Sequence, residues 1–495
     1  MKFNHELPQP GSGSLARPTL GEIAQEYSVD RASLVDQMMP IASGTGTFFD
    51  ENIDLRDPEG SALTARILEI YDAVRPRRRK RGRKALAVRI RKLVANGLRG
   101  HFFRLPPAVL YFTKADAEQY KDKPTWMKHG ALGDVVKALS DAGLVRAIKG
   151  KKMPWNSDKK SWASSYWITD DFIHMALDYG ISTDSIERRM PVNGLVQLFA
   201  PKPGPEFKWY KGGLVYVRKG ERINFSPTAE TQEWTDTLEA INAFYRQQEI
   251  ALGLSAAELE LWLADRNAES GMKGAPYRLP ELFSTDIYRV FNNGDADHPK
   301  FDEGGRLFGG WWMNIPESLR QAITINGEPT VEVDYKNCHP RMLYHERGLD
   351  GDGELYSISE ISTYEAATGV RAATYRPCIK WLMQILINGR GRPEAVERPA
   401  DMVFPPDISI TKLVALIEAR HEPIASSFRT GAGLRLMRLE SDIALEIISS
   451  AMHEGFMVLS VHDSFITTND KRDRLKTMMI DAYVRRLEKE PALKG

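Results

Sequence analysis

Two apolar segments that lie far apart in the sequence each deliver one aspartate, and this pair constrains the fold more than any other feature. The first segment, VEVDY, alternates as a strand does and carries Asp334 near its end. The second, residues 455–468, has the β-type runs MVLSV and SFITT on either side of His462 and Asp463, which predicts a hairpin with a carboxylate at its tip. Because the apolar flanks would bury both strands, we expect two carboxylates held rigidly at the edge of a core.

Paired carboxylates on rigid strands suit metal-dependent phosphoryl transfer. A lone aspartate at a strand end or in a turn is ordinary, so the interpretation depends on the pair. Two magnesium ions about 3.5–4 Å apart need hard oxygen ligands, which carboxylates supply. One ion would activate an attacking 3′-hydroxyl, and the other would support a triphosphate and the leaving pyrophosphate. The sequence thus predicts that Asp334 and Asp463 bind two Mg²⁺ ions, which Mn²⁺ could replace.

A third segment, TYRPCIKWLMQILINGRGR at residues 374–392, has the pattern of an amphipathic helix. Pro377 stands where a helix can start, since its missing N–H costs nothing there, and Gly389 stands where it can end. A helix N-terminus with an arginine and a lysine on one face can hold a triphosphate. An ordinary surface helix with scattered cations is the alternative. The polar residues at intervals of four share one face: Arg376, Lys380, Gln384 and Asn388.

A glycine-rich segment, FDEGGRLFGGWWMNIP at residues 301–316, precedes both aspartates. The glycines beside Arg306 would let the backbone approach a partner closely. Taken alone, the segment indicates only a glycine-rich loop.

Taken in their order along the chain, the four segments resemble the motifs of the superfamily that unites family A DNA polymerases with phage-type single-subunit RNA polymerases. The resemblance covers roughly residues 300–470 and depends on the joint order of the motifs. The residues that resemble motif A are Asp334, Tyr335, Arg341 and His345. Those that resemble motif B are Arg376, Lys380 and Gly389, and motif C is matched by Val461, His462 and Asp463. Asp302 with Gly305 and Arg306 is similar to an Asp-x-x-Gly-Arg element of the RNA polymerases, and Gly305-Arg306-Leu307 with Asn314-Ile315-Pro316 is similar to a family A stretch.

This resemblance implies an α+β, multidomain protein whose right-hand palm, an antiparallel sheet, carries helical fingers. It implies a template-directed nucleotidyltransferase that uses a DNA template and nucleoside triphosphates to make an RNA or DNA strand. The implied catalytic residues are Asp334, Asp463 and Lys380. The implied nucleotide-binding residues are Arg376, Lys380, Tyr335, His339, Gln384, Asn388 and Gly389. Arg306 and His462 would contact nucleic acid.

Three departures from the family pattern leave the sugar preference open. His339 stands where family A has a glutamate that screens the sugar 2′ position, Asn388 stands where a tyrosine is usual, and Ser464 replaces a second carboxylate. We favour RNA polymerase or primase-like synthesis over a family A type DNA polymerase of plasmid or phage replication. A DNA-binding replication initiator with a degenerate palm is the alternative of another class, and template-independent terminal transfer is a weaker one.

The N-terminal part carries a dense basic run, RPRRRKRGRK, at residues 75–84. Farther on, residues 128–172 read as a helix, a strand, a basic turn and a second strand, which is the order of a winged helix. A solvated charged face, or a helix and hairpin that serve only as scaffolding, is the alternative. The residues of the run that we expect to bind nucleic acid are Arg77, Arg78, Arg79, Lys80 and Arg81.

Length and composition set the remaining expectations. The 495 residues suggest several domains, and a net charge of only +1 means that overall charge does not indicate a polyanionic partner. Two cysteines cannot form a disulfide framework, and no apolar run approaches the roughly 18 residues of a membrane span, so we expect a cytoplasmic protein without a membrane partner. The sequence predicts no oligomeric state. The expected regions are a disordered lead-in at 1–20, a helical region with the basic run at 21–98, a winged-helix-like domain at 99–175, a strand-rich linker and thumb-like helices at 176–290, and palm and fingers at 291–495.

Overall fold

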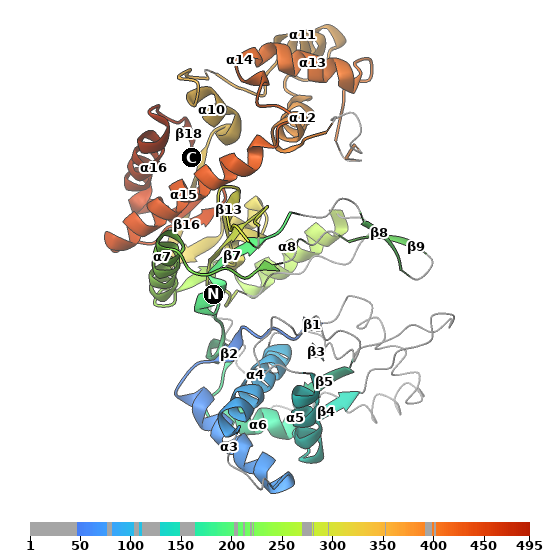
Figure 1. The fold of residues 1–495 in the computed structure, drawn as a ribbon, viewed down its shortest axis with the longest axis vertical. Coiled ribbons are helices and arrows are strands. Elements are labelled where there is room, and N and C mark those ends of the chain that lie inside the picture. The colour runs from blue at the N-terminus through green and yellow to red at the C-terminus, as the bar shows by residue number, and fades with distance from the viewer. Residues whose placement is uncertain are drawn as a thin grey trace. The chain divides into compact units, whose positions relative to one another are not determined.

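A computed structural model describes residues 47–76, 82–102, 108–110, 129–148, 164–201, 206–210, 213–217, 220, 222–269, 280, 282–295, 297–351, 353–391, 398–399 and 402–495. These residues form a mixed α/β structure with fourteen helices, α3 to α16, and mostly antiparallel sheets (Figure 1). Contacts divide the chain between residues 189 and 190 into two compact units. The five-region division expected from the sequence stays a prediction. No helix in the described ranges is long and apolar enough to cross a membrane.

The N-terminal unit combines four helices with a four-stranded sheet among its described residues. The helices are α3 (Glu59–Val74), α4 (Arg83–Phe102), α5 (His129–Asp141) and α6 (Asp170–Asp178). The sheet has the order β1-β3-β5-β4, from β1 (Thr47–Phe48), β3 (Ala108–Leu110), β5 (Ser164–Ile168) and β4 (Val145–Ile148). A separate ribbon pairs β2 (Ile53–Leu55) with β6 (Ile186–Arg188). The two strands predicted on either side of the basic turn are found as β4 and β5, paired antiparallel, but residues 170–172, expected at the end of the second strand, begin α6 instead.

Two sheets form the base of the C-terminal unit. The first has the order β10-β7-β12-β13, from β10 (Arg222–Ile223), β7 (Val196–Phe199), β12 (Tyr288–Phe291) and β13 (Gly304–Phe308). The second is six-stranded, with β11 (Ile250–Leu252), β14 (Ile323–Ile325), β15 (Glu328–Tyr335), β17 (Ser464–Thr468) and β16 (Leu459–Val461) in that order, while β18 (Leu493–Lys494) pairs with β15. A separate hairpin joins β8 (Glu206–Tyr210) and β9 (Gly213–Val217).

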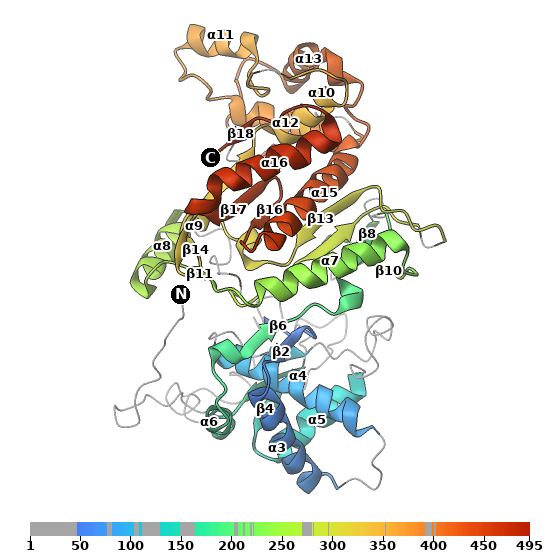
Figure 2. The same cartoon turned by 90° about the vertical axis from the view of Figure 1, so that its left-hand side faces the viewer.

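Helices cover these sheets and extend beyond them. Their bounds are α7 (Ala229–Tyr245), α8 (Ala256–Glu269), α9 (Glu317–Arg320), α10 (Cys338–His345), α11 (Ser359–Thr368), α12 (Arg376–Asn388), α13 (Ile410–Arg420), α14 (Glu422–Ala425), α15 (Ala432–His453) and α16 (Arg472–Leu487). Figure 2 shows α15 and α16 running side by side over the sheet that contains β16 and β17.

Helix α15, the longest among the described residues, packs one face into the core of the C-terminal unit. Leu436, Ile443 and Ile447 are buried at helical spacing, so this face packs inward, against β13, α7 and α12 among others. Beneath it, the side chains of Trp311 and Trp312 are almost completely buried, and the Trp312 indole donates to the carbonyl of Ser460 at 3.1 Å. This hydrogen bond fixes β16, and hence the turn that follows it, to a rigid aromatic core.

Candidate active site

The sheet brings the two aspartates together. Strand β15 pairs antiparallel with β17 so that Asp334 lies opposite Ser464, and the β16–β17 hairpin closes through His462 and Asp463. His462 has the left-handed φ of 57° that this tight turn requires. The amide of Tyr335 donates to the carbonyl of Asp463 at 3.2 Å. The predicted strand and hairpin are thus confirmed. Because Asp463 directly precedes Ser464, the pairing places Asp463 beside the end of β15.

Both aspartates open into one cavity of about 560 Å³. Two of its walls are cationic, because helix α12 contributes Arg376 and Lys380, and strand β18 contributes Lys494. The full lining is Arg306, Asp334, Tyr335, Lys336, Asn337, Cys338, His339, Glu354, Tyr356, Arg376, Lys380, Gln384, Met437, His462, Asp463 and Lys494. Three acidic and five basic side chains therefore line a single hollow, which is suited to an anionic ligand held near a cation.

The two carboxylates are poorly solvated and repel one another. Burial, followed by the charges of Asp463 and Glu332, raises the pKa of Asp334 to about 7. Burial, followed by the charge of Glu440, also raises the pKa of Asp463. Desolvation and like charge both disfavour a carboxylate, so each group would gain from a bound cation. Clustered, perturbed carboxylates in a cavity are a physical signature of functional sites.

The predicted helix is confirmed as α12, which begins at Arg376 with Pro377 in its first turn. The buried carboxylate of Glu365 accepts hydrogen bonds from the amides of Ala373 and Tyr375, both at 2.9 Å, and so fixes the entry into the helix. Ala373 has a left-handed φ of 63°, which a non-glycine residue adopts only when its surroundings hold it there.

The cations of α12 gather around Tyr356. The guanidinium of Arg376 lies 5.2 Å and the Nζ of Lys380 5.9 Å from the centre of its ring, within the range of cation–π attraction. Arg376 also donates to Glu354 at 3.1 Å, whereas Lys380 has no carboxylate partner among the described residues.

The far end of α12 leaves the cavity. Gln384 lines it, but Asn388 and Gly389 do not. The amide nitrogen of Asn388 donates to the carbonyl of Gln384 at 2.8 Å, and its side chain occupies the space that a Cβ at Gly433 would fill. Gly389 ends the helix as predicted, although with an extended φ of −87° rather than a left-handed cap. A nucleotide contact by Asn388 or Gly389 stays a prediction.

Glu440, which the sequence reasoning missed, connects two of the predicted residues. Its carboxylate lies 2.7 Å from the Nε2 of His339 and accepts from Arg306 at 3.1 and 2.8 Å. Although burial opposes ionisation, the hydrogen bond and charge of His339, and then those of Arg306, lower the pKa of Glu440 to about 2. An acidic residue between Leu436 and Ile443, on the apolar stripe of α15, was the signal that could have revealed it.

Some of the remaining predicted residues line the cavity, and others form hydrogen bonds next to it. Tyr335 lines the cavity, but its hydroxyl donates to the carbonyl of Met479 at 2.6 Å, so its polar end points into the core. His462 lines the cavity from the hairpin turn. Ser464 donates to Glu332 at 2.5 Å, and Glu332 also accepts from Arg320 at two positions 2.9 Å away. The sequence reasoning also missed Glu354, Tyr356, Lys336 and Lys494, which carry no motif of their own.

The donor set fits a magnesium ion that completes its coordination elsewhere. Within the described part of the chain, no group of three or more His, Cys, Asp and Glu side chains could hold a metal by itself. Two hard carboxylates whose ionised forms burial disfavours are nevertheless the kind of ligand that Mg²⁺ takes at phosphate-binding sites, where substrate oxygens and water supply the rest. Asp334 and Asp463 are the side chains that would hold it.

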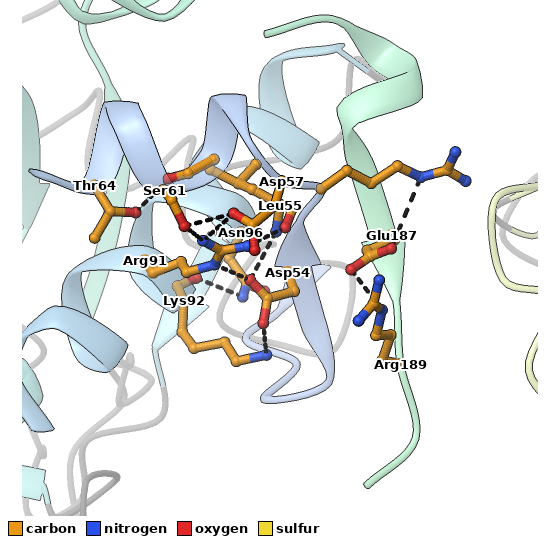
Figure 3. A network of polar contacts seen from close by, with 12 residues as sticks. Asp54, Leu55, Asp57, Ser61, Thr64, Arg91, Lys92, Asn96, Glu187 and Arg189 are labelled. Carbon is orange, nitrogen blue, oxygen red and sulfur yellow. Dashed lines mark hydrogen bonds and ion pairs between the residues drawn. The ribbon is translucent and has the colours of Figure 1, made fainter. Parts of the chain in front are cut away.

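In the N-terminal unit, several basic side chains bind neighbouring acids (Figure 3). Arg91 of α4 donates to Asp54 at 2.6 Å and to Asp57 at 2.9 Å, and Lys92 pairs with Asp54 at 2.7 Å. Arg56 and Arg189 both pair with the buried carboxylate of Glu187, at 3.8 and 2.7 Å. These contacts join α4 to β2 and to Asp57, just before α3, and they join β6 to Arg56, which follows β2. The predicted nucleic-acid contacts Arg77, Arg78, Arg79, Lys80 and Arg81 lie outside the described residues.

Comparisons with known proteins add little to this geometry. No protein-family model matches the sequence, and no curated protein matches it. Among solved structures, the chain is similar to the polymerase domain of Pol1 from M. smegmatis in complex with DNA primer-template and dNTP. The identity is 11%, the TM-score is 0.20, and the match covers 96% of this chain and 71% of that one. A TM-score this low does not show a common fold.

Proposed function

We propose that residues 190–495 form a nucleotidyltransferase that extends a nucleic-acid chain on a template by two-metal phosphoryl transfer. The observation that carries this proposal is the shared cavity in which Asp334 and Asp463 face the cationic side chains of α12. A polymerase needs both halves of this arrangement, namely carboxylates for metal ions and cations for a triphosphate. The sheet that contains β15, β16 and β17 would be the palm, and α11 to α14 would belong to the fingers.

Each group has a role in this proposal. When bound, magnesium would lower the pKa of the attacking 3′-hydroxyl and neutralise charge on the phosphates. Asp334 and Asp463 would hold the ions on rigid strands, and Arg376 would orient the triphosphate from the start of α12. Lys380 would contact the phosphates and could donate a proton to the leaving pyrophosphate. Arg306 and His462, which also line the cavity, would contact the nucleic-acid strands.

The sugar preference within this proposal leans towards ribonucleotides. His339 lines the cavity, and its Nε2 is engaged by Glu440, which leaves Nδ1 without a partner among the described residues. Because Nδ1 is itself buried, the ring offers no free nitrogen to a 2′-hydroxyl as it lies here; the ribonucleotide preference is proposed because His339 stands where the resembled DNA polymerases have the glutamate that screens the 2′ position. RNA polymerase or primase-like synthesis on DNA is therefore the first candidate, and a DNA polymerase of plasmid or phage replication the second.

For the N-terminal unit, we propose nucleic-acid binding by a winged helix. The support is the strand order β3-β5-β4 with helix α5 immediately before β4, which is compatible with such a module. However, the exposed positions Asp134, Lys137 and Asp141 of α5 mix both charges, so phosphate binding would depend on other residues, such as those of the basic run. A replication initiator with an inactive palm is the competing reading.

A primer-extension experiment tests the proposal. Primed and unprimed DNA templates are incubated with Mg²⁺ and either NTPs or dNTPs, and product length is measured. We expect incorporation by the wild type and a loss of about a thousandfold or more in Asp334→Asn and in Asp463→Asn, since each removes a metal ligand. The matched control is Asp473→Asn, an exposed acid in the first turn of α16, which should keep wild-type activity.

Two results would contradict this proposal. Aspartate variants that retain more than about a tenth of the activity would remove the two-metal assignment. A wild type that binds DNA but incorporates neither kind of nucleotide would favour the initiator.

A further inference from the structure

Lys494 lies beside the first aspartate, although it is distant from it in sequence. Strand β18 pairs antiparallel with the end of β15, with Lys494 opposite Asp334 and Leu493 opposite Tyr335. The amide of Lys336 donates to the carbonyl of Ala492 at 2.8 Å, which extends the pairing. Directly opposed residues of an antiparallel pair project from the same face of the sheet. Lys494 therefore flanks Asp334 on the side away from β17, and it lines the same cavity.

The charge of Lys494 is available to a ligand. Of the cavity's five basic residues, Arg306 pairs with Glu440, while Arg376 and Lys336 pair with Glu354. Lys380 and Lys494 have no ion pair with any carboxylate in the described ranges. Lys494 is also exposed, so its ammonium can meet a ligand without leaving a buried position.

We propose that Lys494 is a second phosphate-contacting residue, which binds a non-bridging oxygen of the incoming triphosphate from the sheet side while Lys380 binds it from α12. This inference rests on the proposed nucleotidyl transfer and adds a residue that belongs to none of the sequence motifs. A compact ammonium with three donors can follow phosphate oxygens without fixed geometry. Cations on both sides of the aspartates would hold the triphosphate over the metal ligands.

Equilibrium titrations of ATP, dATP, AMP and inorganic pyrophosphate with the full chain test this inference. We expect Lys494→Ala to weaken ATP and pyrophosphate binding about tenfold or more, because a hydrogen bond between charged groups is lost. AMP binding should change much less, and Lys494→Arg should restore most of the loss. The backbone pairing of β18 does not use the Lys494 side chain, so the fold should persist, which circular dichroism checks.

The matched control is Lys489→Ala, because Lys489 lies just before β18 but pairs with Asp350 at the surface, outside the cavity. If Lys494→Ala binds ATP and pyrophosphate as the wild type does, while Asp334→Asn abolishes incorporation, the inference is wrong and the nucleotidyltransferase stands. An equal loss for AMP and ATP would also overturn it, since the contact would then not be with the outer phosphates. If the aspartate variants remain active, the proposed function itself fails, and the inference fails with it.

Discussion

At the scale of single residues, the cavity contains a carboxylate that opposes folding. Asp334 has a pKa of about 7 in the folded chain, against an ordinary value of 3.8. Between these two values the unfolded chain is ionised and the folded one is protonated. The unfolded state therefore binds fewer protons, and the metal-free protein should lose stability as the pH rises from about 4 to about 7.

Asp334→Asn should remove this pH-dependent loss of stability. In a chelating buffer at pH 8, we expect the variant to be more stable than the wild type by on the order of 1–2 kcal/mol, and the difference should disappear towards pH 4. Thermal unfolding across this pH range measures it. Asp473→Asn, at an exposed position, should follow the wild-type curve throughout. A variant that is less stable than the wild type at pH 8 would mean that the Asp334 carboxylate is satisfied in the folded chain.

Glu440 is the opposite case, a buried charge that the fold satisfies. Its carboxylate, 3% exposed, bridges His339 and Arg306. Glu440→Ala would leave both partners without a counter-charge, so we expect a loss of about 3–5 kcal/mol in the free energy of unfolding. Urea denaturation provides the measurement. Glu346→Ala, which breaks the more exposed pair with Arg435, is the comparison and should cost at most about 1 kcal/mol. Equal losses would contradict the importance assigned to this bridge.

At the scale of elements, helix α12 presents the basic side chains of Arg376 and Lys380 to the cavity. Glu365 accepts a hydrogen bond from Tyr375, directly before the helix. The ring of Tyr356 lies near Arg376 and Lys380, and Glu354 binds Arg376. Arg376 forms an ion pair with Glu354, whereas Lys380 has no carboxylate partner in the described part of the chain. Replacing each of the two residues should therefore affect nucleotide incorporation differently.

We expect Lys380→Ala to lower the maximal rate of incorporation about a hundredfold or more and to weaken nucleotide binding. Arg376→Ala should act mainly on binding. Single-turnover kinetics at varied nucleotide concentration separates the two effects. Lys412→Ala, an exposed lysine on α13, serves as the control. Unchanged nucleotide affinity in both cavity variants would contradict the role of this helix face.

At the scale of the whole molecule, the two units should divide the work between nucleic acid and nucleotide. Replacing Arg77, Arg78, Arg79, Lys80 and Arg81 by glutamine should weaken DNA binding and flatten its dependence on salt by about 0.9 per lost phosphate contact. Nucleotide affinity should not change. Fluorescence anisotropy at several salt concentrations gives the slope. An identical slope before and after the replacement would show that the run does not contact phosphates.

The sequence by itself determined the local elements of the site. Alternation around Val331 and Val333 specified β15, the two apolar runs around Asp463 specified the β16–β17 hairpin, and Pro377 with Gly389 bounded α12. These three elements could be predicted because strand alternation, turn preference and helix termination depend on neighbours along the chain.

Only the tertiary structure decided which side chains meet. Glu440 reaches His339 across 101 residues, Lys494 pairs beside Asp334, and Asn388 turns away from the cavity because Gly433 leaves room for it. No periodicity encodes such contacts, since they depend on how close α12, α15 and β18 come to the end of β15. Shared burial also gives Asp334 its raised pKa, which its neighbours in sequence alone do not predict.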